Sequence, residues 1–111
     1  MTFENLYDSL EIGQLAIALF YGPSCAPCAS LKPKLRKACA DLEIRLEEFN
    51  TSNEMEAVRL MGLRTVPAVV LVRRGGIARV LFTGDQPDST LRLQLIAHGI
   101  PIPNAPDSLP A

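Results

Sequence analysis

The N-terminal part of the chain shows an amphipathic helical pattern followed by an uninterrupted apolar run. Four apolar residues recur at the spacing of one helix face, namely Phe3, Leu6, Tyr7 and Leu10. Gly13 is suited to closing this helix. Residues 15–21, LAIALFY, are apolar throughout, which is typical of a short strand buried on both faces. Gly22-Pro23-Ser24 then predicts a break.

A long helical pattern comes next, followed by two shorter elements. From Cys25 to Leu42 the apolar residues fall on one helix face, namely Leu31, Leu35, Ala38 or Cys39, and Leu42. Residues 44–50 predict a second strand, with weaker alternation. Residues 51–54, TSNE, fit a capping box that would open a helix ending at Gly62. The predicted inward residues of that helix are Met55, Val58 and Met61.

The C-terminal half contains a hairpin pattern and a last helix. Residues 68–72 form an apolar, largely β-branched run, residues 73–76 (RRGG) predict a turn, and residues 77–82 return as the second arm. Asp88 is suited to capping a last helix that stops at Gly99. The predicted inward residues of this helix are Leu91, Leu95 and Ile96.

The predicted order is helix, strand, helix, strand, helix, hairpin, helix, which favours an α/β fold. The strand–helix–strand part requires a right-handed crossover and a parallel pair of strands. The hairpin adds an antiparallel arm, so we expect a mixed four-stranded sheet covered by helices on both faces. The 111 residues suffice for one domain, which we assign to residues 1–99. Residues 100–111 contain four of the nine prolines and predict an extended, poorly ordered tail.

Composition and charge exclude several classes of protein. Apolar residues make up 48% of the chain and charged residues 21%, so a wholly disordered chain is excluded. Eleven Lys and Arg against twelve Asp and Glu give a net charge of −1, and without a polybasic run we expect no nucleic-acid partner. The longest apolar run is far shorter than the ~20 residues of a membrane helix, so we expect no membrane partner. The N-terminal MTFENLYDSL lacks the features of a secretory signal, which favours a cytoplasmic protein.

The strongest candidate for chemistry is the tetrapeptide Cys25-Ala26-Pro27-Cys28, between the buried strand and the long helix. Two thiols at this spacing on a first helical turn can reach disulfide distance. The helix N-terminus offers unpaired amides and a positive dipole, which stabilise the thiolate of the leading cysteine. Pro27 suits the first turn, where its missing N–H costs no helical hydrogen bond. We therefore expect Cys25 to be the exposed nucleophile and Cys28 the resolving thiol.

Other interpretations of the cysteines are weaker. A structural zinc site needs four ligands, and the chain offers only Cys39 and His98 in addition to the pair. Cys39 lies eleven residues beyond Cys28 on the same helix, about 16 Å away, so we expect no metal. An accidental pair is disfavoured by its place between strand and helix. Cys39 is most simply a core residue, with a regulatory thiol as the alternative, and His98 is expected to interact with a helix C-terminus.

Several motifs occur together at spacings that resemble the thioredoxin family, from about Leu15 to Gly99. The tetrapeptide is similar to the family's Cys-Gly-Pro-Cys, with Ala26 for Gly, and Pro33 matches the proline that kinks the active-site helix. Thr65-Val66-Pro67 matches the family's cis-proline loop, and Gly84 matches a glycine of its substrate-binding surface. The resemblance implies a thioredoxin-like three-layer α/β/α sandwich in which an N-terminal helix stands in place of the family's first strand.

The resemblance also implies an activity. The protein would be a thiol–disulfide oxidoreductase that reduces protein disulfides through Cys25 attack and Cys28 resolution, with this redox-active pair and no bound cofactor. Its partners would be disulfide-containing proteins and either a thioredoxin-reductase-like enzyme or a low-molecular-weight thiol, and we expect a monomer. A cis Val66–Pro67 bond would let the Val66 backbone pair with an extended substrate. Substrate contacts would come from Ser24, Thr65, Val66 and Gly84. Support for the cysteine pair would come from Ala26, Pro27, Glu48 and Pro67.

Three substitutions depart from the family pattern. Ser24 replaces a tryptophan before the first cysteine, and its hydroxyl could cap the helix instead. Leu19 stands in place of a buried aspartate below the resolving cysteine, and Glu48 in place of the lysine paired with it. We expect slower resolution of mixed disulfides, unless Glu48 turns inward as a replacement base. These losses keep a second function open, a binding or assembly module whose dithiol is not needed, and metal delivery is a third.

Overall fold

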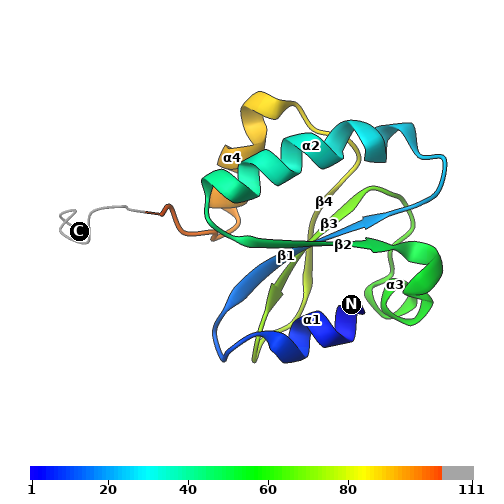
Figure 1. Ribbon diagram of the computed structural model, residues 1–111, viewed down its shortest axis with the longest axis horizontal. Coiled ribbons are helices and arrows are strands. Elements are labelled where there is room, and N and C mark those ends of the chain that lie inside the picture. Colours follow the sequence, from blue (N-terminus) through cyan, green and yellow to red (C-terminus); the bar gives the residue numbers. More distant parts are fainter. Residues whose placement is uncertain (104–111) are drawn as a thin grey trace.

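The computed structural model of the chain describes residues 1–103 and shows one sheet between two layers of helices (Figure 1). In chain order the helices and strands are α1 (Phe3–Ser9), β1 (Leu15–Tyr21), α2 (Ala26–Asp41), β2 (Arg45–Asn50), the 3-10 turn η1 (Thr51–Asn53), α3 (Met55–Met61), β3 (Ala68–Arg73), β4 (Arg79–Thr83) and α4 (Asp88–Ala97). The longest helix, α2, has 16 residues. Within residues 1–103 none of the helices combines the length and hydropathy needed to cross a membrane.

The sheet has the strand order β2-β1-β3-β4. β1 pairs in parallel with β2 and antiparallel with β3, and β3 pairs antiparallel with β4. The sheet formed by the described residues is therefore mixed and four-stranded, as predicted, and the helix α1 precedes its first strand. β1 lies between two neighbours, which agrees with its uniformly apolar sequence.

Alternate residues of β1 face the two helical layers. Ile17 and Leu19 belong to the core under α2 and α4, which also contains Leu31, Leu35, Leu91 and Leu95. The neighbouring residues Ala16, Ala18 and Phe20 belong to the core under α1, together with Leu6, Leu10 and Phe49. Figure 1 shows the same division, with α2 and α4 on one side of the strands and α1 and α3 on the other. The two cores share the sheet, so β1 is fixed from both sides.

The core under α1 is organised around three aromatic rings. The ring centroids of Phe3 and Phe20 are 5.4 Å apart, and those of Phe20 and Phe49 are 5.6 Å apart. Phe20 has no exposed surface. Aromatic pairs at such distances stabilise beyond the area they bury. The cluster therefore joins α1 to β1 and β2.

Two predicted helix starts are wrong in detail. The capping box at residues 51–54 does not form, because Thr51 lies inside η1 and the Asn50 side chain accepts the Ser52 N–H at 2.9 Å. α3 then begins at Met55 without a side-chain cap, and Met55 is 67% exposed instead of facing the core. Asp88 is the first residue of α4, and Pro87 occupies the cap position. In each case the cap position falls on a residue other than the predicted one, which is Glu54 for α3 and Pro87 for α4.

Two boundaries near the C-terminus also differ from the prediction. β4 begins at Arg79, and Ile77 lies in the turn with 92% of its surface exposed, so the second arm is shorter than residues 77–82 suggested. Ile100, predicted as the first tail residue, is only 2% exposed and packs in the core under α2 and α4. The remainder of the predicted tail from residue 104 lies outside the described residues.

Phe20→Ala tests the aromatic cluster. We expect a loss of about 3–5 kcal/mol in the free energy of unfolding, because a fully buried ring is removed and a cavity remains. The measurement is urea unfolding of the oxidised protein, with the exposed Ile77→Ala as the control, expected to change stability by less than about 0.5 kcal/mol. A Phe20→Ala loss as small as that of the control would show that the cluster does not hold the fold together.

Candidate functional site

The strand register brings four chain segments to one edge of the sheet. Tyr21, at the end of β1, lies opposite Asn50 at the end of β2. Ala68, the first residue of β3, pairs with Phe20 on one side and with Thr83, the last residue of β4, on the other. The loops that follow β1, β2 and β4 and the loop that precedes β3 therefore meet at this edge. These loops carry the cysteine pair, Pro67 and Gly84.

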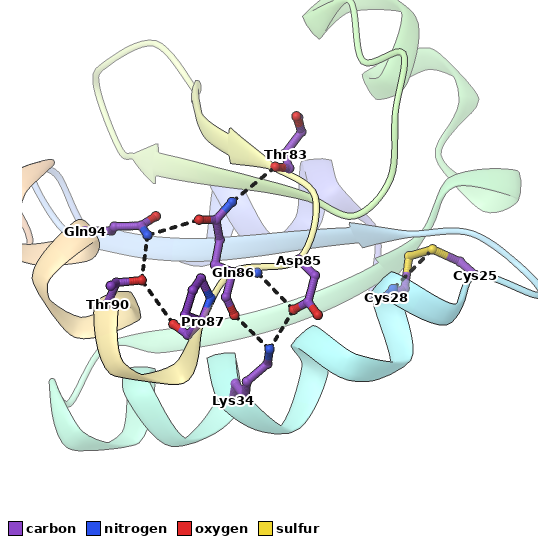
Figure 2. Close-up of polar contacts among 9 residues, drawn as sticks. All are labelled: Cys25, Cys28, Lys34, Thr83, Asp85, Gln86, Pro87, Thr90 and Gln94. Atoms are coloured by element: carbon purple, nitrogen blue, oxygen red, sulfur yellow. Dashed lines mark hydrogen bonds and ion pairs between the residues drawn. A yellow bond between two sulfur atoms is a disulfide. The ribbon is translucent and has the colours of Figure 1, made fainter.

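Cys25 and Cys28 form a disulfide at the start of α2, with their Cα atoms 5.2 Å apart (Figure 2). Cys25 is the N-cap of the helix, and its Sγ accepts the Cys28 N–H at 3.2 Å. Cys25 is partly exposed, whereas Cys28 is only 2% exposed. The helix N-terminus thus directs an amide at the sulfur that solvent can reach, which favours negative charge on that sulfur when the pair is reduced.

Ser24 does not cap α2, contrary to the prediction. The cap position belongs to Cys25, whose sulfur takes the amide that a serine hydroxyl was expected to accept. Ser24 is exposed and has a φ of 53°, a left-handed conformation that is uncommon for a residue with a side chain. Ala26 and Pro27 form the exposed first residues of the helix, beside the disulfide.

The loop before β3 lies against the disulfide. Its Val66–Pro67 peptide bond is cis, as the resemblance implied. The Val66 carbonyl oxygen is 3.8 Å from Cys25 Sγ. The Gly84 N–H donates to the Pro67 carbonyl at 2.8 Å, so the loop after β4 is bonded to the same segment. Thr65, another of the expected substrate contacts, lies in the same loop and is exposed.

Sequence reasoning missed two contacts that hold these loops. A Cβ at Gly22 would lie 3.3 Å from a methyl group of Val66, so the missing side chain lets the two loops approach closely. Lys34 of α2 binds the loop after β4, with its Nζ 2.8 Å from the Asp85 carboxylate and 2.7 Å from the Gln86 carbonyl (Figure 2). The Lys34 ammonium lowers the pKa of Asp85 below its usual value. These contacts tie the Gly84 loop to the helix that carries the cysteines.

The positions of the family's buried acid and its lysine are filled by Leu19 and Glu48, which are direct neighbours across β1 and β2. Leu19 has no exposed surface and packs in the core under α2 and α4. Both carboxylate oxygens of Glu48 accept from the Arg36 guanidinium, at 2.6 and 2.8 Å. This pairing lowers the pKa of Glu48, which weakens it as a proton acceptor. The geometry therefore supports an ion pair at Glu48 more than a replacement base.

The third cysteine belongs to the core. Cys39 is 1% exposed, and burial raises the pKa of its thiol to about 12. His98 occupies the C-cap of α4, the end of the helix predicted for it. Across residues 1–103, His, Cys, Asp and Glu side chains nowhere gather in a group of three that could hold a metal ion.

Comparison with known proteins identifies what this arrangement is similar to. The sequence model of the Thioredoxin family matches residues 2–97. Protein disulfide-isomerase of Gallus gallus is 32% identical over 76 residues, which are 64% of this chain and 15% of that protein. DnaJ homolog subfamily C member 10 of Mus musculus is 27% identical over 92 residues, which are 81% of this chain and 12% of that protein. The chain thus spans a small part of the length of these curated relatives.

Solved structures agree with the fold. Thioredoxin from Trypanosoma brucei brucei superposes with a TM-score of 0.71 at 18% identity, over 87% of this chain and 85% of that one. Fasciola hepatica thioredoxin superposes with a TM-score of 0.69 at 21% identity, over 86% of this chain and 89% of that one. At these identities the likeness concerns the fold.

The Glu48→Gln variant tests whether Glu48 is an ion-pair partner or a catalytic base. We expect resolution of a mixed disulfide on Cys25 to proceed at the wild-type rate, because Arg36 holds both carboxylate oxygens. The ion pair makes Glu48 easier to ionise in the folded chain, so its stabilising effect is present above the ordinary pKa of 4.5 and is lost as pH falls through the lower folded pKa. Urea unfolding should show the variant less stable than wild type at neutral pH, with the difference shrinking as pH falls below 4.5 and through the lower folded pKa. Slower resolution in the variant would assign the base role to Glu48.

Alkylation tests the burial of Cys39. In the reduced folded protein near neutral pH we expect iodoacetamide to modify Cys25 and to leave Cys39 unmodified, because its thiol is buried and has a pKa of about 12. Unfolding in urea should make Cys39 as reactive as an ordinary cysteine. Peptide mass spectrometry counts the modified sites. Rapid labelling of Cys39 in the folded protein would restore the regulatory interpretation of this thiol.

Proposed function

The chain belongs to the thioredoxin family, and from that premise we propose that it reduces protein disulfides with Cys25 and Cys28. Family membership supports thiol–disulfide oxidoreductase chemistry in general. The observation that carries the specific proposal is the disulfide itself, with one partly exposed sulfur at a helix N-cap and one buried sulfur a turn away. An exposed sulfur can react with a substrate disulfide. The buried sulfur beside it can then attack the mixed disulfide and release the substrate.

The first step is attack by the reduced pair on a substrate disulfide. The Cys25 thiolate forms a bond to one substrate sulfur, and the substrate's own S–S bond breaks. The leaving substrate thiolate takes a proton from solvent. In the oxidised pair Cys25 Sγ accepts the Cys28 N–H, and the same amide would stabilise the attacking thiolate. The product is a mixed disulfide between Cys25 and the substrate.

The second step releases the substrate. The Cys28 thiol loses its proton and attacks Cys25 Sγ, which forms the internal disulfide and expels the second substrate thiolate. Two electrons have then passed from the pair to the substrate, and two protons have followed them. A reductase or a low-molecular-weight thiol would return the pair to the dithiol.

The loop at Val66 is the proposed place for the substrate backbone. Its carbonyl lies 3.8 Å from Cys25 Sγ, so a chain that bonded to it in extended form would pass directly by the sulfur. Backbone pairing of this kind ignores sequence and positions a disulfide for in-line attack. Thr65, Ser24 and Gly84 surround this path as proposed substrate contacts.

Cys28→Ser should trap the mixed disulfide. Without the resolving thiol, the reduced variant incubated with a protein disulfide such as insulin should accumulate a covalent adduct on Cys25, visible as an increase in intact mass. Cys25→Ser should form no adduct and should lower insulin reduction to the uncatalysed rate. Cys39→Ala is the matched control, because Cys39 is buried away from the pair, and it should reduce insulin at the wild-type rate.

Equal insulin reduction by wild type and Cys25→Ser would contradict the proposal. The alternative is a binding or assembly module, and it would be favoured if a Cys25→Ser, Cys28→Ser double variant kept full biological activity. A glutathione redox titration of the pair completes the test, because its potential decides whether the pair donates or withdraws electrons in a given compartment.

A further inference from the structure

We propose that the site prefers disulfides flanked by acidic residues, and that Lys32 recognises the substrate carboxylate. This inference rests on the proposed disulfide-reducing function and names the substrate class on which it acts. It comes from the charges that surround the cysteine pair. The proposed ligand chemistry is a carboxylate, supplied by an Asp or Glu side chain next to the substrate cysteine.

Lys32 lies beside the disulfide in an open depression of the surface. The depression is lined by both cysteines, by residues of the preceding loop and by Tyr21 and Lys32. Among its lining residues Lys32 is the one Lys, Arg, Asp or Glu side chain. Lys32 follows Cys28 by four positions on α2, which places the two residues on the same face of the helix. A substrate bound across the cysteines would therefore meet one cation.

The Lys32 ammonium is held in place by an aromatic ring. Its Nζ is 3.5 Å from the centroid of the Tyr21 ring, a cation–π contact. The side chain remains partly exposed. In the part of the chain that the structure describes, no carboxylate forms an ion pair with Lys32. The contact with the ring orients the charge without neutralising it.

Two acidic residues that contact α2, Glu48 and Asp85, already form ion pairs. Glu48 accepts two hydrogen bonds from Arg36, and Asp85 accepts one from Lys34. Lys32 also lowers the pKa of Glu48, but by less than Arg36 does. A further cation, exposed Arg64, directly precedes the Thr65-Val66-Pro67 loop. The site therefore carries uncompensated positive charge, although the whole chain has a net charge of −1.

A carboxylate within about 4 Å of such a cation gains enough attraction, even at the dielectric of water, to change a rate constant about fivefold. This attraction acts in the encounter and in the bound complex, and salt screens it. Backbone pairing at Val66 would ignore the substrate's side chains, so the residue next to the substrate cysteine is where Lys32 can discriminate. Acidic, neutral and basic flanks should thus react in that order.

The test uses three disulfide-linked peptide dimers that differ only at the residues flanking the cysteine, which are Glu, Gln or Lys. The full chain is reduced and mixed with each dimer at low ionic strength, and acid-quenched samples are quantified by chromatography. For wild type we expect the second-order rate constant with Glu to exceed that with Gln by about fivefold, and that with Lys to be lower again. High salt should compress these ratios.

Lys32→Gln should bring the Glu-to-Gln ratio close to one, because the ratio divides out any effect of the substitution on the reaction with the Gln dimer. Lys32→Arg retains the charge and should retain the preference. Lys37→Gln is the matched control, because Lys37 is exposed on the same helix, does not line the depression, and its loss changes the net charge equally. The control should keep the wild-type ratio.

Three outcomes would overturn the inference. An unchanged ratio in Lys32→Gln would remove Lys32 from recognition, and an equal loss in Lys37→Gln would reduce the effect to overall charge. Glutathione disulfide, which also carries carboxylates, is a further arm: Lys32-dependent reaction with glutathione but not with the Glu dimer would assign the cation to a small-molecule partner. Failure to reduce even the Gln dimer would instead contradict the proposed function, and the inference would fall with it.

Discussion

The burial of β1 on both faces is the constraint on which the rest of the structure depends. Ile17 and Leu19 pack under α2 and α4, and the residues between and beside them pack under α1, so neither layer can shift without disturbing the other. This packing fixes the position at which β1 ends. That end leads directly into Cys25, and the strand's neighbours bring Pro67 and Gly84 to the same edge. The geometry of the cysteine pair is therefore a consequence of packing some distance below it.

The same constraint explains how the chain distributes its charges. Leu19 occupies a fully buried position, where a lone ionised group would be costly, and it adds an apolar side chain to the core. Charged residues are instead placed on the helix surface, where Arg36 pairs with Glu48 and Lys34 with Asp85. Lys34 additionally fixes the loop that follows β4. Ion pairs at the surface thus position loops, while the interior stays apolar.

Patterns within a short stretch of sequence predicted most of the fold and the cysteine pair that forms the disulfide at the start of α2. The apolar run of β1 and the cysteine spacing are local, and both were located correctly. The link between Lys34 and Asp85 joins residues 51 positions apart, so no local pattern could reveal it. The caps failed for another reason, since adjacent residues compete for the same amides: Cys25 displaced Ser24 at α2. Such competition is decided by backbone geometry that the sequence does not display.

Under the proposed function, Leu19 in place of the family's buried acid would have two opposite effects on Cys28. The resemblance places an aspartate below the resolving cysteine, where it could accept the proton, and a leucine side chain cannot do so. The same aspartate, when ionised, would also repel a thiolate beside it. Leu19 removes that repulsion, and Lys32 adds a positive charge on the same helix face one turn beyond Cys28. In the proposed mechanism the chain would thus lose assistance in removing the proton, while the resulting thiolate would meet less electrostatic repulsion. Under the proposed function, resolution would use solvent as the proton acceptor, and the neighbouring cations would favour the charged sulfur.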